Sequence, residues 1–179
     1  LFAMSLAACQ QIARAPVTAT TPTAPIVQTK SVSTTAPAWG AAVQEWTLSV
    51  SAGPNETYLI HIADAQGKEL QVLEGPGGDA PLDASGLLRL EDFTGDGKVD
   101  ILARGLSAGA SALTSEIIYA YDPQARRFMN AENFENEGEV SKTSAGCIAV
   151  EHRNADNMTY AKDHYCWDGG KWTFKGSKQ

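Results

Sequence analysis

The sequence predicts an antiparallel all-β domain from about residue 41 onward. Apolar residues alternate with polar ones in many short runs, which is the pattern of half-buried strands. Sequences typical of tight turns separate these runs. Helical periodicity is scarce, and only segments 107–115 and 130–136 are compatible with short helices. Short strands with turns at this spacing indicate blade-like or sandwich packing.

The alternating runs follow one another along the whole domain. Their apolar positions, with one histidine, are Trp46, Leu48 and Val50; Tyr58, Ile60 and Ile62; Leu70 and Val72; Leu88 and Leu90; Val99, Ile101 and Ala103; Ile117, Tyr119 and Tyr121; Ile148, Val150 and His152; and Trp172 and Phe174. Hairpin turns are expected at 64–67, 122–125 and 168–170, where Asp and Gly favour chain reversal. We expect the aromatic residues to be core, and no clean sequence repeat is visible.

Two cysteines lie in the last predicted strands. Pairing Cys147 with Cys166 leaves residues 155–158 as a hairpin tip, which suits an antiparallel register. In an oxidising compartment a disulfide is favoured over free thiols. It would contribute on the order of 3 kcal/mol by restricting the unfolded chain.

The segment 92–100, Asp-Phe-Thr-Gly-Asp-Gly-Lys-Val-Asp, predicts a calcium loop. Oxygen-bearing side chains occupy loop positions 1, 3, 5 and 9, and Gly97 at position 6 permits the sharp turn. The expected ligands are the side chains of Asp92, Thr94, Asp96 and Asp100 and the backbone carbonyl of Lys98. Three carboxylates this close repel one another unless a cation neutralises them.

The setting of this loop differs from that of an EF-hand. Position 12 is Ala103 rather than a bidentate Glu, and period-two patterning on both sides indicates strand, loop, strand. The alternative is a metal-free Asp/Gly turn. No candidate base or nucleophile adjoins the loop, so the calcium is expected to be structural.

The amino-terminal region predicts a lipoprotein. Residues 1–8 are apolar and run into Cys9, which resembles the end of a bacterial signal peptide with an acylated cysteine. Gln10 after the cysteine would favour the outer membrane. The alternative is an apolar terminus with an incidental cysteine. Residues 10–40 are rich in Thr, Ala and Pro and contain no acid, so we expect a disordered tether before a domain at 41–179.

Charge narrows the range of partners. Arg14 and Lys30 are the only charges before residue 41, which leaves 12 basic against 21 acidic residues, a net charge of −9, on the domain. An acidic surface disfavours nucleic acid and favours a basic partner, although solubility alone would also explain it. The three histidines show no metal-ligand spacing with the cysteines, and the chain has no phosphate-binding glycine loop.

Together, several segments resemble one protein family. They are the Cys9 lipobox, the tether, the loop 92–101, the Tyr-Ala-Tyr-Asp-Pro segment 119–123 with Arg127 and Phe128, and the ending 160–172. They resemble periplasmic calcium-binding lipoproteins that act as immunity proteins against peptidoglycan-hydrolase effectors of bacterium-killing type IV secretion systems. This family is similar to inhibitors of invertebrate-type lysozymes and has an integrin-like (FG-GAP-type) calcium loop. The resemblance covers roughly residues 43–175.

The resemblance implies an incomplete, β-propeller-like domain whose protruding loop blocks the cleft of a lysozyme-like enzyme. The blocking loop falls on residues 105–115, and its candidate contacts are Gly105, Ser107, Gly109, Ser111 and Thr114. Family members tend to carry an aromatic residue there, whereas this chain has none until Tyr119. An ordinary flexible connection is the alternative. The segment 154–158 beside Tyr160 is a second candidate surface.

Two rival functions remain open. The first is a calcium-stabilised binding module for glycan or protein at the cell surface, because the ion stiffens a loop whatever the partner is. The second is a hydrolase, because residues 105–109 match Gly-x-Ser-x-Gly, and Asp122 and His152 or His164 follow Ser107 in order. That motif needs a strand-to-helix elbow on a largely parallel sheet, which this sequence does not predict. We therefore expect no enzymatic activity.

Overall fold

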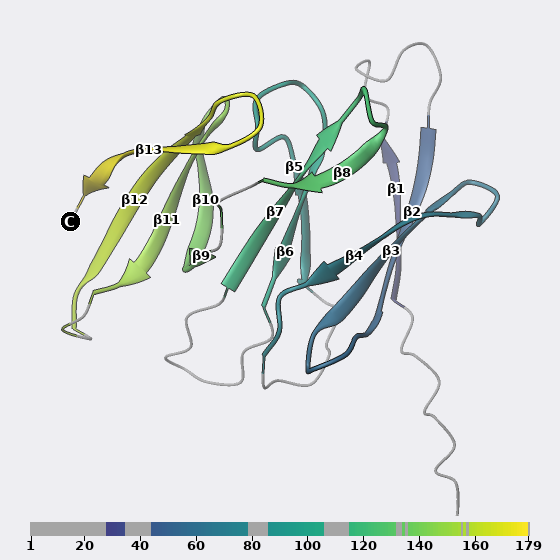
Figure 1. The fold of residues 1–179 in the computed structure, drawn as a ribbon, viewed down its shortest axis with the longest axis horizontal. Coiled ribbons are helices and arrows are strands. Elements are labelled where there is room, and N and C mark those ends of the chain that lie inside the picture. Colours follow the sequence, from purple (N-terminus) through teal and green to yellow (C-terminus); the bar gives the residue numbers. More distant parts are fainter. Residues whose placement is uncertain are drawn as a thin grey trace, which may run out of the picture.

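The computed structural model describes residues 28–34, 44–78, 86–105, 115–131, 134, 136–154, 156 and 158–178. These residues form strands and turns without a helix, which confirms the antiparallel all-β class. The strands build three sheets in succession along the chain (Figure 1). Consequently, no helix long and apolar enough to cross a membrane occurs in the described ranges.

Each sheet is a meander of consecutive strands. The first contains β1 (Gln28–Thr34), β2 (Gln44–Ala52), β3 (Tyr58–Asp64) and β4 (Glu69–Gly75). The central sheet contains β5 (Leu88–Glu91), β6 (Asp100–Arg104), β7 (Ser115–Asp122) and β8 (Arg127–Asn130), with β9 (Asn136–Glu137) beside β7. The third contains β10 (Glu139–Ser144), β11 (Cys147–Arg153), β12 (Tyr160–Trp167) and β13 (Trp172–Lys178). This arrangement is consistent with an incomplete propeller-like or a sandwich-like domain.

Strands β6 and β7 of the central sheet are largely buried on both faces because the sheet packs between the other two. Ile101 and Ala103 of β6 belong to a core shared with the first sheet, whereas Leu102 between them belongs to a core shared with the third. All three side chains are at most 1% exposed. Because side chains alternate across a strand, β6 can serve two cores with one run of apolar residues. Burial of each large side chain contributes about 1.5–3 kcal/mol.

Polar contacts fix the first sheet against the central one. The Gln71 side chain of β4 donates to the Phe128 carbonyl at 2.7 Å and accepts from the Phe128 N–H at 2.9 Å. Its amide therefore pairs with β8 as a neighbouring strand would. The Tyr58 hydroxyl donates to the Arg104 carbonyl at 2.7 Å, and the Tyr119 hydroxyl donates to the Glu74 carbonyl.

Two features of the first sheet differ from expectation. β1 lies inside the segment 10–40, predicted to be a tether, and its backbone pairs with β2 from Gln28↔Val50 to Thr34↔Gln44. In β4, Leu70 and Val72 were the expected core positions, but they are 48% and 40% exposed. The alternate residues Gln71, Leu73 and Gly75 pair instead with the inward-facing residues of β3. The β3–β4 pairing has a register irregularity between Ile62 and Ala63.

The predicted hairpins and disulfide are present. The Asp64 and Asp122 carboxylates accept backbone N–H groups within their own turns, and the Asp168 N–H donates to the Lys171 carbonyl at 2.9 Å. Cys147 and Cys166 are paired in the β11–β12 register and joined by a disulfide, which confirms that prediction. β11 ends at Arg153 and β12 begins at Tyr160, and the Asn154 N–H donates to the Thr159 carbonyl at 2.9 Å, which leaves residues 155–158 between the paired ends as expected.

Candidate metal loop and adjoining cleft

The predicted calcium loop connects β5 to β6 at one end of the central sheet. Gly95 and Gly97 have φ values of +75° and +82°, in the left-handed region that favours glycine. A Cβ atom at Gly95 would collide with the Gly146 backbone in the β10–β11 turn. The loop therefore packs closely against the third sheet, and this contact depends on glycine.

Asp92 and Asp96 shape the loop through their carboxylates. Asp92 Oδ1 accepts from the Gly95 N–H at 2.7 Å, and Asp92 Oδ2 accepts from the Gly97 N–H at 3.2 Å. Asp96 Oδ1 accepts from the Lys98 N–H, and Asp96 Oδ2 lies 2.9 Å from Lys98 Nζ. A second ammonium, that of Lys142, donates to the Asp92 carbonyl. Two lysines thus place positive charge on this loop.

Asp100 anchors the loop from inside the fold. Its side chain is fully buried; Oδ2 accepts from the Phe93 and Thr94 N–H groups at 2.9 Å, and Oδ1 accepts from the Tyr121 N–H at 3.1 Å. Burial raises the pKa of Asp100 to about 6, and backbone donors from Thr94 and Tyr121 oppose that rise. Asp100 therefore joins the loop to β7 in the central sheet.

The residue types present fit a hard cation. Thr94 Oγ1 is buried and makes no well-formed hydrogen bond among the described residues, although the hydroxyl is close enough to Asp100 to lower its pKa. Asp100 accepts three hydrogen bonds, which leaves one lone-pair direction. No group of three or more His, Cys, Asp and Glu side chains is arranged to hold a metal in the described part of the chain. A calcium site here would therefore need the Thr94 hydroxyl and the Lys98 carbonyl, and Asp96 would have to turn from the Lys98 ammonium.

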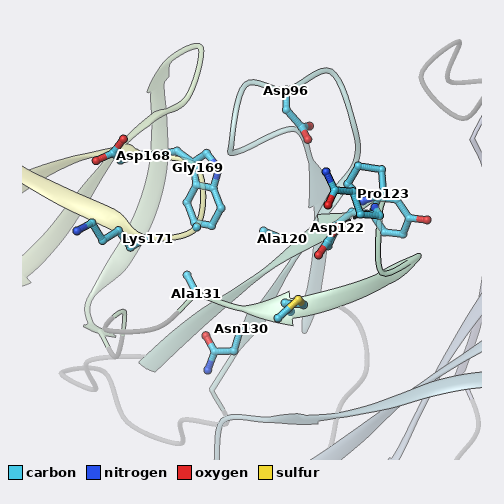
Figure 2. Close-up of a pocket in the computed structure, with 14 residues that line it drawn as sticks. Asp96, Ala120, Asp122, Pro123, Asn130, Ala131, Asp168, Gly169 and Lys171 are labelled. Atoms are coloured by element: carbon cyan, nitrogen blue, oxygen red, sulfur yellow. Dashed lines mark hydrogen bonds between the residues drawn. The ribbon is translucent and has the colours of Figure 1, made fainter.

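A cleft of about 740 Å³ adjoins this loop. The loop, the β7–β8 hairpin and the β12–β13 hairpin surround it (Figure 2). Small residues create the hollow: Ala120 and Ala131 lie in its floor, and Gly169 lies in the hairpin beside it. This cleft could not be predicted from the sequence, because its residues come from segments far apart in the chain.

Only part of the predicted partner loop can be placed. Gly105, directly after β6, is the last described residue before the segment. Its N–H donates to the Ser115 carbonyl at 2.6 Å. A Cβ atom at Gly105 would lie 2.7 Å from Ser115 Oγ, so the two ends of the segment approach closely. Ser107, Gly109, Ser111 and Thr114 lie outside the described residues, as does Cys9.

Sequence analysis missed Glu116, which lies at the base of this segment. Glu116 is fully buried; Oε1 accepts from Arg104 Nε at 2.8 Å, and Oε2 accepts from the Val140 N–H at 2.6 Å. It thereby joins β6, β7 and β10. The available signal was an acid directly before the apolar run 117–121, because a buried charge needs partners.

Two of the residues named in the hydrolase interpretation, Asp122 and His152, have other contacts. Asp122 Oδ1 accepts N–H groups of its own turn, and His152 Nε2 lies 3.3 Å from Asp163 on the third sheet. Ser107, the predicted nucleophile, lies outside the described residues.

A separate Ser-His-Glu arrangement, absent from the sequence predictions, lies on the outer face of the first sheet. Ser51 Oγ and Glu69 Oε2 each lie 2.8 Å from a ring nitrogen of His61. These residues lie on the adjacent, antiparallel strands β2, β3 and β4.

No family model and no curated protein matches this sequence. Among solved structures, the chain is similar to a Xanthomonas protein described as related to a type IV secretion system. The two are 13% identical, with a TM-score of 0.45, and the alignment covers 82% of this chain and 78% of the other. A likeness of this degree carries no functional assignment.

Proposed function

We propose that this protein is a calcium-binding, lipid-anchored inhibitor of a peptidoglycan hydrolase in the periplasm. Cys9 would carry the lipid and hold the protein at the outer membrane, its only membrane contact. The segment 105–115 would enter the active site of a lysozyme-like partner. The protein itself would have no catalytic role and no nucleic-acid partner.

The observation that carries this proposal is the hydrogen-bonded network at the two ends of the segment 105–115. Gly105 and Ser115 are joined backbone to backbone, and buried Glu116 holds Arg104 and the Val140 N–H beside them. The Tyr58 hydroxyl holds the Arg104 carbonyl from the first sheet. A binding loop with fixed ends loses less conformational entropy when it enters a cleft.

The calcium loop contributes differently to this proposal. It lies at the opposite end of β6 from Arg104, so the ion would not touch the partner through 105–115. Its role would be to stiffen the β5–β6 connection and its contact with Gly146. The side chains of Asp92, Thr94, Asp96 and Asp100 and the Lys98 carbonyl would bind the ion.

A calcium-stabilised surface module for glycan or protein is the second candidate. The cleft beside the loop favours it, because a hollow with carboxylate, amide and indole groups can bind a ligand without residues 105–115. In that case a partner would contact the hairpins 121–124 and 167–171.

A peptidoglycan lysis assay tests the inhibitor proposal. The full chain, with Cys9→Ser to prevent acylation, is added to a lysozyme-like hydrolase encoded beside its gene, and loss of turbidity is followed. We expect inhibition by this protein and by Ser141→Arg, whose exposed side chain lies on β10. Ser111→Arg should abolish inhibition. Undiminished lysis with the unaltered loop, or equal inhibition by both arginine variants, would contradict the proposal.

A further inference from the structure

The cleft beside the metal loop is a separate surface from residues 105–115. β6 runs from Asp100 beside the loop to Arg104, and β7 returns from Ser115 to Asp122 in the cleft wall. The cleft and the described residues Gly105 and Ser115 therefore lie toward opposite ends of β6 and β7.

The carboxylates around the cleft differ in orientation. Asp96 and Asp122 point toward the hollow, whereas Asp168 and Lys171 point away from it, on the far side of their hairpin (Figure 2). Asp122 Oδ1 accepts from the Gln124 and Ala125 N–H groups, so Oδ2 retains capacity to accept. Asp96 is 35% exposed and already attracts the Lys98 ammonium. The Lys98 ammonium offsets part of the Asp96 charge, so Asp122 Oδ2 is the main acceptor that the cleft offers to a cation.

The floor of the cleft is apolar. Ala120 and Ala131 are buried, and Met129 is 41% exposed in the same lining, with Trp167 nearby along it. Methionine and indole groups pack well against methylene chains. An apolar floor below two carboxylates matches a long side chain that ends in a positive charge.

We propose that this cleft binds an arginine or lysine side chain of a partner protein. The methylene stem would lie on the Ala120–Met129–Ala131 floor, and the charged end would bind Asp122 Oδ2 with Asp96 opposite. The acidic charge of the whole domain would steer such a partner toward it. This inference stands apart from the inhibitor proposal, since neither surface is needed for the other.

The test uses the full chain with Cys9→Ser, labelled with ¹⁵N and kept in chelator so that Asp96 has no metal. The probe is the peptide acetyl-Ala-Arg-Ala-amide, and its citrulline counterpart has the same shape without the charge. With the arginine peptide alone, we expect amide chemical-shift changes at Ala120, Gln124, Gly169 and Gly170. The dissociation constant fitted to them should lie in the millimolar range. A neutral glycan, chitotetraose, is titrated in parallel.

Two variants test whether the Asp122 carboxylate binds the charged end of the arginine side chain. Asp122→Asn keeps an oxygen for the turn and should weaken arginine binding about threefold. Asp64→Asn removes the same charge from an equivalent turn in the β3–β4 hairpin and should leave binding unchanged. Equal binding of the citrulline peptide, equal binding by both variants, or cleft shifts with chitotetraose alone would overturn the proposal. These results are independent of the lysis assay.

Discussion

Replacement of Glu116 by alanine should destabilise the protein strongly, because the side chain serves two sheets at once. The change leaves the buried Val140 N–H without its acceptor, which costs about 1–3 kcal/mol. It also removes the partner of Arg104, but Arg104 is 38% exposed, so solvent reduces that loss to at most about 1 kcal/mol. With the cavity left behind, we expect about 3 kcal/mol lower free energy of unfolding.

Two companion variants make this expectation specific. Glu116→Gln keeps one oxygen for the Val140 N–H and should cost about half as much. Glu139→Ala removes an acid that is 71% exposed and 3.9 Å from Arg104, so it should change stability by less than about 0.5 kcal/mol. Urea denaturation gives the three free energies. A cost for Glu116→Ala no larger than that for Glu139→Ala would refute the proposed role of Glu116.

Three further predictions concern the buried tyrosines, the metal and the serines. Burial raises the pKa of Tyr119 to about 12 and raises that of Tyr58 as well, so the stability they contribute is present below pH 10 and lost as the pH rises toward 12. Absorbance at about 295 nm should show late ionisation, and Tyr119→Phe should flatten this loss of stability. Calcium at about 100 times its Kd should raise the free energy of unfolding by about 2.7 kcal/mol, and Asp96→Ala should abolish that gain. Identical melting temperatures with calcium and with chelator would contradict the calcium site. A fluorophosphonate should label neither Ser51 nor Ser107, and mass spectrometry showing adduct on either would support a hydrolase instead.

Local chemistry explains which parts of the fold were predictable from the sequence. The turn at Asp64 was predictable because its own carboxylate accepts the N–H groups of the following residues. Disulfide pairing was predictable because one hairpin brings Cys147 opposite Cys166. In both cases the decisive partners are close in sequence or in one register.

Other features depend on contacts between sheets. The sequence suggested that Leu70 and Val72 of β4 face the core. Instead the opposite face of the strand points inward, where the Gln71 amide pairs with the Phe128 backbone. Glu116 accepts a hydrogen bond from the Val140 N–H, which belongs to another sheet. The cleft arises where three loops meet, and no single segment carries that information. The turn-forming glycines of the loop 92–100 were predictable from the sequence, whereas the hydrogen bond from the Tyr121 N–H to Asp100 was not.

Hydrogen exchange of the chain, measured alone and with its cognate hydrolase, tests the inhibitor proposal most directly. The account predicts that the hydrolase slows exchange within residues 105–115 while the hairpins at 121–124 and 167–171 exchange as before. Protection confined to those hairpins, or none in either region under inhibitory conditions, would contradict it.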